Sequence, residues 1–368
     1  MKFATKTRTA LLVAGGTGGH IFPGLAVANA LLLAGWQVQW LGGRGENGNP
    51  SMEARLVPAQ QIPFQSIEFS GVRGKGFFTL MRLPFSLLKA VTQCWAVFRN
   101  VKPDLVVGFG GYVTFPAGLV SALLRKPLVL HEQNSVAGMA NRQLARFASR
   151  VFTAFPRVLP KGEWIGNPLR NEFWNQPTPD ERFKNRSGPL RILVLGGSLG
   201  AAALNDTVPK AIALLPEDDR PYVLHQSGQK QFEQLQTNYR AAGVQASLTP
   251  FIDDVAQAIA DADLLVCRAG ASTVTELAAI GAAAIFVPFP AAVDDHQTSN
   301  ARYLADCGGA ILIPQSQFTP ERLANRIRGS RRADWMVMAE LCKKLEKIGA
   351  TEQIVMACKE LVSSRSFA

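Results

Sequence analysis

The sequence contains little cysteine and no long apolar run. Its five cysteines form no C-x-x-C pair and have no regular spacing, which is typical of reduced thiols in a cytoplasmic protein. No stretch approaches the roughly 18 consecutive apolar residues that a membrane-spanning helix requires. The triplet Asp261-Ala262-Asp263 imitates a D-x-D metal motif but precedes a predicted strand instead of following one. No other spacing of His, Cys, Asp or Glu suggests a metal site.

Acidic residues are scarce in the first half of the chain. Residues 1–170 contain 19 Lys and Arg but only 6 Asp and Glu, a net charge of +13. Residues 171–368 contain 20 Lys and Arg and 22 Asp and Glu, a net charge of −2. The excess positive charge indicates a polyanionic partner for the first half, which leaves nucleic acid, anionic lipid and a phosphorylated substrate as alternatives.

The sequence does contain a regular alternation of strand-like and helix-like segments. Short, nearly continuous apolar strands separated by helices are typical of parallel sheets that are covered on both faces. The polar, proline-containing stretch 171–189 lacks strand periodicity and is interpreted as a linker. The predicted strands are 9–14, 37–41, 64–69, 105–109, 128–131 and 150–153 in the first half, and 191–195, 222–225, 247–250, 264–267, 284–287 and 310–313 in the second.

The predicted fold class is therefore α/β, with two Rossmann-like, doubly wound parallel-sheet domains. The first covers residues 1–170 and the second covers residues 171–346. The end of the chain is helical in character. We expect a terminal helix at about 347–368 to pack back on the first domain.

A glycine-rich turn occurs twice, each time between a predicted buried strand and a predicted helix. The first spans residues 15–20 (GGTGGH) and the second spans residues 196–201 (GGSLGA). Glycine lets a ligand approach the main chain, and the first amides of the following helix favour anions. Each turn taken alone is equally consistent with a tight strand-to-helix connection. Together they favour two similar nucleotide-binding folds that face one cleft.

The chain lacks the residues that two common nucleotide sites need. A dinucleotide site places Asp or Glu at the end of the second strand, but here the second strands end in WLGGR at 40–44 and in HQSG at 225–228. The segment 71–75 (GVRGK) has too few residues between its glycines for a phosphate-binding loop, and no Ser or Thr follows its lysine. Binding of NAD or FAD and hydrolysis of ATP are therefore disfavoured.

The segment 267–276 (CRAGASTVTE) follows a predicted strand and opens a helix. Gly270 permits a close approach, and small residues leave the first amides of the helix accessible to a phosphate. Glu276 lies about one and a half turns along the helix, where a carboxylate can accept hydrogen bonds from a ribose diol. The alternative is an exposed glutamate that merely favours the N-terminal half of the helix.

Two further polar groups are candidate binding elements. The cluster 294–300 (DDHQTSN) follows a predicted strand and either caps the next helix or grips a sugar. His20 directly follows the first glycine turn. A histidine there acts as a general base, binds a diphosphate or caps the turn.

The segment 71–99 combines apolar and basic residues. Its apolar density is typical of a core helix. Its beginning is also what an interfacial membrane contact needs, because it joins apolar insertion to attraction toward anionic lipid. Both interpretations remain open from these residues alone. The residues that interleave are Phe77, Phe78, Leu80, Met81, Leu83 and Phe85 with Arg73, Lys75, Arg82 and Lys89.

Seven motifs follow one another along nearly the whole chain. They are GGTGGHIFPGLAVA at 15–28, VVGFGGYVTFPAG at 106–118, HEQNSVAGMANR at 131–142, GNPLR at 166–170, LGGSLGAAALN at 195–205, CRAGASTVTELAAIG at 267–281 and DDHQTSNA at 294–301. In this order and spacing they resemble the bacterial N-acetylglucosaminyltransferases of peptidoglycan synthesis, which convert lipid I to lipid II. Seven ordered motifs are far more specific than a glycine turn.

The resemblance implies the two-domain B-type glycosyltransferase fold. It also implies an inverting, metal-independent transfer of N-acetylglucosamine from UDP-GlcNAc to the C4 hydroxyl of the muramoyl sugar of lipid I, with no cofactor. The first domain would receive lipid I at the cytoplasmic face of the inner membrane and meet anionic lipid there. The second domain would hold UDP-GlcNAc.

The resemblance also implies which residues form the site. His20 is our candidate general base, motivated by its place on the glycine turn. Arg170, Ser198 and the helix start near Ala271 would stabilise the departing UDP. By motif position, the implied donor-binding residues are Thr17, Gly18, Gly19 and Asn134, and further along the chain Arg170, Ser198, Ile252, Ala271, Ser272, Thr273, Val274, Thr275, Glu276 and Gln297.

Two alternatives from other classes remain. One is a different sugar-nucleotide enzyme of similar fold, such as an epimerase or a transferase that acts on another glycolipid. The other is a nucleic-acid-binding protein that uses the basic half. The ordered loops and the lack of an aromatic-basic RNA motif disfavour it, so we expect no nucleic-acid partner.

Overall fold

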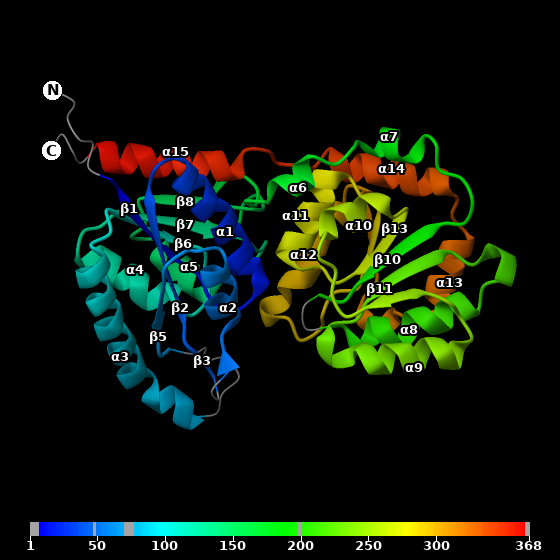
Figure 1. The fold of residues 1–368 in the computed structure, drawn as a ribbon, viewed down its shortest axis with the longest axis horizontal. Helices are drawn as coiled ribbons and strands as arrows, with labels where there is room; N and C mark the ends of the chain where they lie inside the picture. Colours follow the sequence, from blue (N-terminus) through cyan, green and yellow to red (C-terminus); the bar gives the residue numbers. More distant parts are fainter. Residues whose placement is uncertain (1–6, 47–48, 70–76, 198–199, 365–368) are drawn as a thin grey trace. The chain divides into compact units, whose positions relative to one another are not determined.

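The computed structural model describes residues 7–46, 49–69, 77–197 and 200–364. The chain divides into two compact units, which are residues 1–170 together with 349–368, and residues 171–348. Each unit is built on one parallel sheet with helices packed against it (Figure 1). The predicted fold class, α/β with two Rossmann-like parallel-sheet domains, is confirmed.

The first unit contains a seven-stranded sheet in the order β5-β2-β1-β6-β7-β8-β9. All neighbouring strands in it are parallel. The direction of strand addition reverses between β1 and β6, and open α/β sheets bind ligands at the carboxyl ends of the strands at such a point. The strands are β1 (Thr9–Val13), β2 (Gln37–Gly43), β5 (Phe64–Ile67), β6 (Leu105–Gly108), β7 (Leu128–Glu132), β8 (Arg150–Thr153) and β9 (Glu163–Trp164), with β3 (Gly45–Glu46) and β4 (Asn49–Pro50) as a separate antiparallel pair.

Apolar layers cover both faces of this sheet. One layer includes Ile21 and Val27, and the other includes Cys94 and Val120. The last helix, at the C-terminal end of the chain, belongs to the first layer, where Ile354 is fully buried. The helices of this unit are α1 (Gly18–Leu33), α2 (Met52–Ala59), α3 (Phe77–Val101), α4 (Thr114–Leu123), α5 (Met139–Leu144) and α15 (Ala350–Ser363).

The second unit repeats the same plan with a six-stranded parallel sheet in the order β12-β11-β10-β13-β14-β15. In this sheet the direction of strand addition reverses between β10 and β13. The strands are β10 (Arg191–Leu195), β11 (Tyr222–Gln226), β12 (Ser247–Thr249), β13 (Leu264–Cys267), β14 (Ala284–Phe286) and β15 (Ala310–Leu312). The α-helices are α6 (Asn171–Trp174), α7 (Pro179–Phe183), α8 (Ala202–Ala213), α9 (Phe232–Ala242), α10 (Val255–Asp261), α11 (Ala271–Ile280), α12 (His296–Ala305), α13 (Pro320–Arg328) and α14 (Arg332–Lys343).

All the predicted strands are present, with ends that differ by at most two residues. The short strands β3, β4 and β9 were not predicted, because two residues carry no periodicity. The interpretation of 171–189 as a linker is wrong. This stretch forms α6 and α7 and buries Phe173 and Phe183 to exposed fractions of 1% and 7%. Two isolated aromatic residues give no apolar repeat. Their burial, together with hydrogen bonds from Arg182 and Arg186 to the carbonyl oxygen of Ala260, holds the segment on the second unit.

Candidate active site

The first glycine turn is held by a buried carboxylate. Glu53 of α2 is fully buried, and its oxygens accept hydrogen bonds from the backbone N–H groups of Gly43 at 3.0 Å and Gly16 at 3.3 Å. Its negative charge opposes a second anion at Gly16. Thr17, the residue before α1, makes no side-chain cap hydrogen bond, so its hydroxyl does not occupy the first amides of that helix.

His20 lies in the first turn of α1 and is partly exposed. Its Nδ1 atom is 3.0 Å from Oε1 of Gln133, which directly follows β7. On another side the ring lies against Gly110, where an added Cβ would be 3.1 Å from both Nδ1 and Cε1 of the imidazole. Gly110 also has a φ of 94°, which side chains rarely tolerate. Residues that follow β6 and β7 therefore fix the His20 ring at the carboxyl edge of the sheet.

The other candidate residues of the first unit lie beside the same strand ends. The backbone N–H of Asn134 donates to Oε1 of Glu132 at 3.0 Å, and its side-chain amide donates to the same oxygen at 3.4 Å. The guanidinium of Arg170 lies 5.8 Å from the centroid of the Phe22 ring. Phe22 is on α1, two residues after His20. Candidates brought to this edge are Thr17, Gly18, Gly19, Asn134 and Arg170.

In the second unit, α11 begins directly after β13 with an uncapped start. Gly270, before its first turn, has extended backbone and offers no side chain to cap the helix. The Oγ atom of Ser272 is buried and has no hydrogen-bond partner within the described part of the chain. A buried hydroxyl without a partner costs free energy, and beside the first amides of a helix it suits an anionic oxygen.

The remaining candidate residues on α11 differ in whether their side chains are available to a ligand. Val274 is fully buried, and the hydroxyl of Thr275 donates to the carbonyl oxygens of Ala271 and Ser272, both at 3.0 Å. These two side chains therefore make their contacts within the second unit. Glu276, on the next turn, is partly exposed.

Three candidates come from other loops of the second unit. Gln297 accepts a hydrogen bond at Oε1 from the backbone N–H of Phe289 at 2.9 Å, which ties the loop after β14 to α12. Ile252 follows β12 and is partly exposed. Ser198 lies outside the described residues.

The second glycine turn is held by an amide rather than a carboxylate. β11 ends at Gln226, whose Oε1 accepts from the N–H of Gly197 at 3.2 Å. Its Nε2 donates to the carbonyl oxygens of Gly197 and Pro250, both at 3.1 Å. A carboxylate in this place could not donate these two bonds. Gln226 therefore occupies, with a different task, the position where a dinucleotide site has an acidic residue.

A buried histidine supports the loop behind this turn. His225 lies 3.0 Å from both the Tyr239 hydroxyl, at Nδ1, and Oδ1 of Asn205, at Nε2. Burial lowers the pKa of His225 to about 3, so its ring is neutral at physiological pH. The Asn205 amide in turn donates to Oε1 of Gln231 at 2.8 Å.

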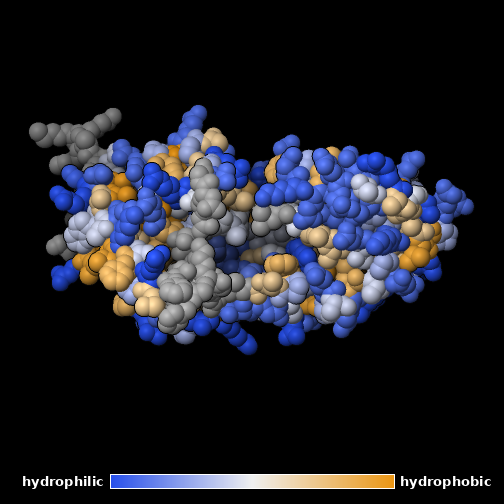
Figure 2. All heavy atoms as spheres, turned by 90° about the horizontal axis from the view of Figure 1, so that it is seen from below, coloured by the Kyte–Doolittle hydropathy of each residue, from blue (hydrophilic) through white to orange (hydrophobic). Residues whose placement is uncertain are grey.

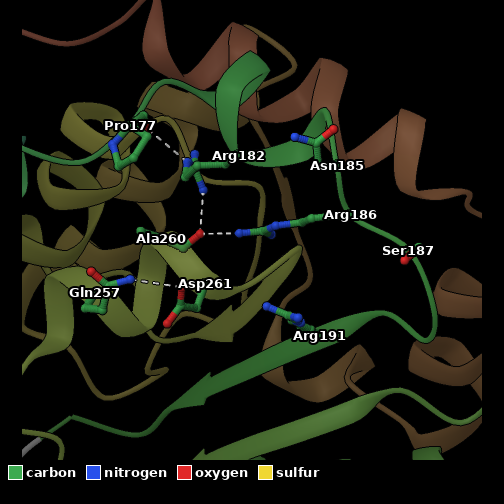
Figure 3. Close-up of a pocket in the computed structure, with 9 residues that line it drawn as sticks. All are labelled: Pro177, Arg182, Asn185, Arg186, Ser187, Arg191, Gln257, Ala260 and Asp261. Carbon is green, nitrogen blue, oxygen red and sulfur yellow. Dashed lines mark hydrogen bonds between the residues drawn. The ribbon is translucent and has the colours of Figure 1, made fainter.

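A cavity of about 390 Å³ in the second unit is built around arginines, but its role is structural (Figure 3). Arg182 donates to the carbonyl oxygens of Ala260 and Gly281, and Arg186 pairs with Asp263 at 2.7 Å. These donors are occupied by the protein, and burial lowers the pKa of Arg182 to about 10. The lining residues, none of which is a candidate site residue, are Pro177, Arg182, Asn185, Arg186, Ser187, Arg191, Gln257, Ala260 and Asp261.

Over the described residues, no three His, Cys, Asp or Glu side chains come close enough together to hold a metal ion. Within the same ranges, no helix has both the length and the apolar character that crossing a bilayer requires.

Both halves of the chain match models of one family. Residues 10–153 match the N-terminal domain of glycosyltransferase family 28, and residues 191–341 match its C-terminal domain. The UDP-N-acetylglucosamine–N-acetylmuramyl-(pentapeptide) pyrophosphoryl-undecaprenol N-acetylglucosamine transferase of Albidiferax ferrireducens is 64% identical over 354 residues, which cover 96% of this chain and 91% of the relative. The protein of the same name from Cupriavidus metallidurans is 56% identical and covers 96% of this chain and 98% of its own length.

Solved structures agree with these matches. The crystal structure of Acinetobacter baumannii MurG has a TM-score of 0.82 and 41% identity, covering 96% of this chain and 99% of that one. The kitacinnamycin glycotransferase, at a TM-score of 0.71, 16% identity and coverage of 97% and 100%, shares the fold alone. The chain therefore belongs to glycosyltransferase family 28, with the two-domain B-type glycosyltransferase fold of the peptidoglycan N-acetylglucosamine transferases.

Proposed function

We propose that this chain transfers N-acetylglucosamine from UDP-GlcNAc to the C4 hydroxyl of the muramoyl sugar of lipid I, with inversion, and so forms lipid II for peptidoglycan. The observation that carries the proposal is the 64% identity, over 96% of the chain, to a relative whose name states this donor and this lipid-linked acceptor. The ordered motifs at both sheet edges support the same reading.

The second unit holds the donor in this proposal. The uncapped start of α11 faces the diphosphate of UDP, and the unpartnered Ser272 hydroxyl supplies a donor for one of its oxygens. Glu276 accepts hydrogen bonds from the ribose diol. The remaining donor contacts of this unit are assigned to Ser198, Ile252, Ala271, Thr273 and Gln297. Val274 and Thr275, which the resemblance also implies, support the start of α11 from within the unit.

The first unit supplies the acceptor side of the reaction. Inversion requires direct attack of the C4 hydroxyl on the anomeric carbon, so one group must remove a proton while others stabilise the departing UDP. His20 is assigned as the base. Thr17, Gly18, Gly19 and Asn134, at the same sheet edge, are assigned to the donor, as the resemblance implies. Arg170, together with the start of α11, supplies positive charge to the leaving group.

A lipid-dependent assay tests this function. With UDP-GlcNAc as donor, we expect UDP release only when lipid I is present, and a product with the inverted linkage. UDP-glucose and UDP-GalNAc should release far less UDP, because binding energy specific to the sugar is lost. Conversion of UDP-GlcNAc to another UDP-sugar without an acceptor would instead identify an epimerase, and preference for another glycolipid would identify a different transferase.

We further propose that the chain works at the cytoplasmic face of the inner membrane through α3. One face of this helix is core, with Ala90 and Cys94 fully buried. Another face leaves Met81, Phe85 and Leu88 exposed by 60%, 76% and 63%. Figure 2 shows orange, apolar side chains on the part of the first unit where Figure 1 places α3.

The charge around this face is basic. Arg82 and Arg99 of α3 are exposed, while Lys89 shares the carboxylate of Glu68 with Arg44. An apolar strip with basic neighbours suits the surface of an anionic bilayer. Of the interleaved residues that suggested membrane contact, those at 73–80 lie outside the side chains that the structure describes.

Vesicle binding tests this face. The wild-type chain should sediment with vesicles that contain phosphatidylglycerol and be released by salt, because the attraction is partly electrostatic. Replacing Phe85 and Leu88 by Ser should weaken partition about ten-fold or more, since two inserted apolar side chains are lost. Tyr222→Ser, at a residue of the second unit that is 67% exposed, is the matched control and should bind as wild type. Equal binding of wild type to neutral vesicles, or of the double variant to anionic ones, would count against this surface.

A further inference from the structure

Behind His20 lies a buried chain of polar groups. Nδ1 of His20 is 3.0 Å from Oε1 of Gln133, Nε2 of Gln133 is 3.1 Å from Nδ1 of His131, and Nε2 of His131 is 2.9 Å from the carbonyl oxygen of Gly166. Gln133 and His131 are both completely buried. These contacts join four of the sequence motifs, those at 15–28, 106–118, 131–142 and 166–170. The motif at 106–118 takes part because the ring of His20 also packs on Gly110.

The direction of each hydrogen bond follows from two backbone carbonyls. The carbonyl oxygen of Gly166 can only accept, so Nε2 of His131 carries the proton and its Nδ1 accepts. The carbonyl of His131 lies 3.2 Å from Nε2 of Gln133, which fixes the nitrogen of that amide on this side. Oε1 of Gln133 must then face His20 as an acceptor.

One protonation state of His131 is consistent with this direction. If its Nδ1 also carried a proton, two donors would face each other across the contact with Gln133. Burial lowers the pKa of His131 to about 4, so the ring is neutral at physiological pH and the conflict does not arise. The amide of Gln133 is therefore held in one orientation.

We propose that Gln133 and His131 are positioning residues that fix the tautomer of His20, with the proton on Nδ1 and the lone pair on Nε2. A general base must present a lone pair to the hydroxyl that it deprotonates, and only Nε2 remains for this task. After proton transfer, the Nδ1–H bond to Gln133 is retained. The catalytic part of this inference rests on the proposed role of His20, whereas the tautomer itself does not.

The ionisable side chains near His20, Gln133 and His131 have hydrogen-bond or aromatic partners of their own. Glu53 of α2 accepts from Gly16 and Gly43. Glu132 of β7 is buried and accepts from the N–H groups of Asn134 and Gly138, each at 3.0 Å. It accepts at the same distance from the Asn141 amide. Arg170 lies over the Phe22 ring. Gln133 is therefore the group whose replacement most directly changes the charge facing Nδ1 of His20.

The tautomer can be measured in the intact protein. Long-range ¹H–¹⁵N correlation spectra of the full chain with ¹⁵N-labelled histidine distinguish Nδ1–H from Nε2–H rings, and the signals that disappear in His20→Gln identify His20. We expect Nδ1–H for His20 in the wild type. An Nε2–H ring there would overturn the proposal, whatever the activity of any variant.

Two variants test the role of Gln133. Gln133→Leu removes the acceptor, so we expect Nε2–H to become populated and kcat to fall about 10-fold to 100-fold with little change in KM for UDP-GlcNAc. Gln133→Glu keeps an acceptor but adds a charge that stabilises the protonated imidazole. The acidic limb of its kcat profile should move to higher pH by about one unit or more.

The matched control is Gln143→Leu on α5, which is partly exposed and should retain wild-type kinetics. A purely structural role for Gln133 predicts lower thermal stability with an unchanged tautomer and an unchanged acidic limb, and this result would refute the positioning role. If the tautomer is as proposed but His20→Ala retains full turnover, the base assignment fails while the hydrogen-bond chain stands.

Discussion

Replacing His20 by Ala should lower kcat by about 10²–10⁴-fold, the usual contribution of a general base. The expectation follows from its placement. The ring is held at the carboxyl edge of the first sheet by Gln133 and Gly110, and it remains partly exposed. UDP release in the presence of lipid I measures the effect. Affinities for both substrates should stay near their wild-type values, because the ring is assigned to proton transfer and not to ground-state binding.

Added imidazole provides the control for this variant. A small base that enters the space left by the side chain should restore part of the turnover of His20→Ala but not change that of the wild type. Near-normal turnover with unchanged substrate affinities would remove His20 from the role of base.

Replacing Glu276 by Ala should weaken the binding of UDP-GlcNAc by about 1–3 kcal/mol, because charged hydrogen bonds to the ribose would be lost. This corresponds to a rise in Kd of about 5-fold to 150-fold. Isothermal titration with UDP-GlcNAc measures it directly. Turnover at saturating donor should change much less than affinity, since the ribose is remote from the reacting carbon.

Glu233→Ala is the matched control for Glu276. It removes the same side chain from an exposed position on α9 of the same unit, and donor affinity should not change. Glu276→Gln, which keeps an acceptor but no charge, should fall between Ala and wild type. Donor affinity that is equal in Glu276→Ala and wild type would remove this residue from the ribose site.

Much of the architecture could be predicted because it depends on neighbours in the sequence. Apolar runs such as 105–108 and 264–267 form buried parallel strands, and glycines at 15–16 and 196–197 form the turns that follow β1 and β10. The alternation of strands and helices then leaves few topologies. The missing second-strand carboxylate is also visible in the sequence, where it argues against a dinucleotide site.

The groups that hold the site together could not be predicted in this way. Glu53 looks like an ordinary helix residue, yet it bonds the backbone of Gly16, 37 positions earlier. In the sequence Gln226 is notable only because it is not an acid, whereas in the structure its amide holds the second glycine turn. Each of these hydrogen bonds forms only because the sheet brings distant segments together.

The stretch 171–189 shows the same limit for the fold. Its polar composition is typical of a linker, but Arg182 and Arg186 donate to backbone carbonyls that lie more than 70 positions away. Buried carbonyl groups at helix ends need donors, and these arginines provide them. Composition alone does not reveal which donors a distant helix end requires.

The sequence by itself therefore determined the two parallel sheets, their glycine turns and the chemical types of residue at the strand ends. Tertiary structure alone decided which of these residues touch, including the pairing of His20 with Gln133 across 113 positions. The physical reason is that strand formation and turns are governed by local backbone preferences and apolar periodicity. Hydrogen bonds between side chains instead depend on orientations that exist only once the sheet and its helices have packed.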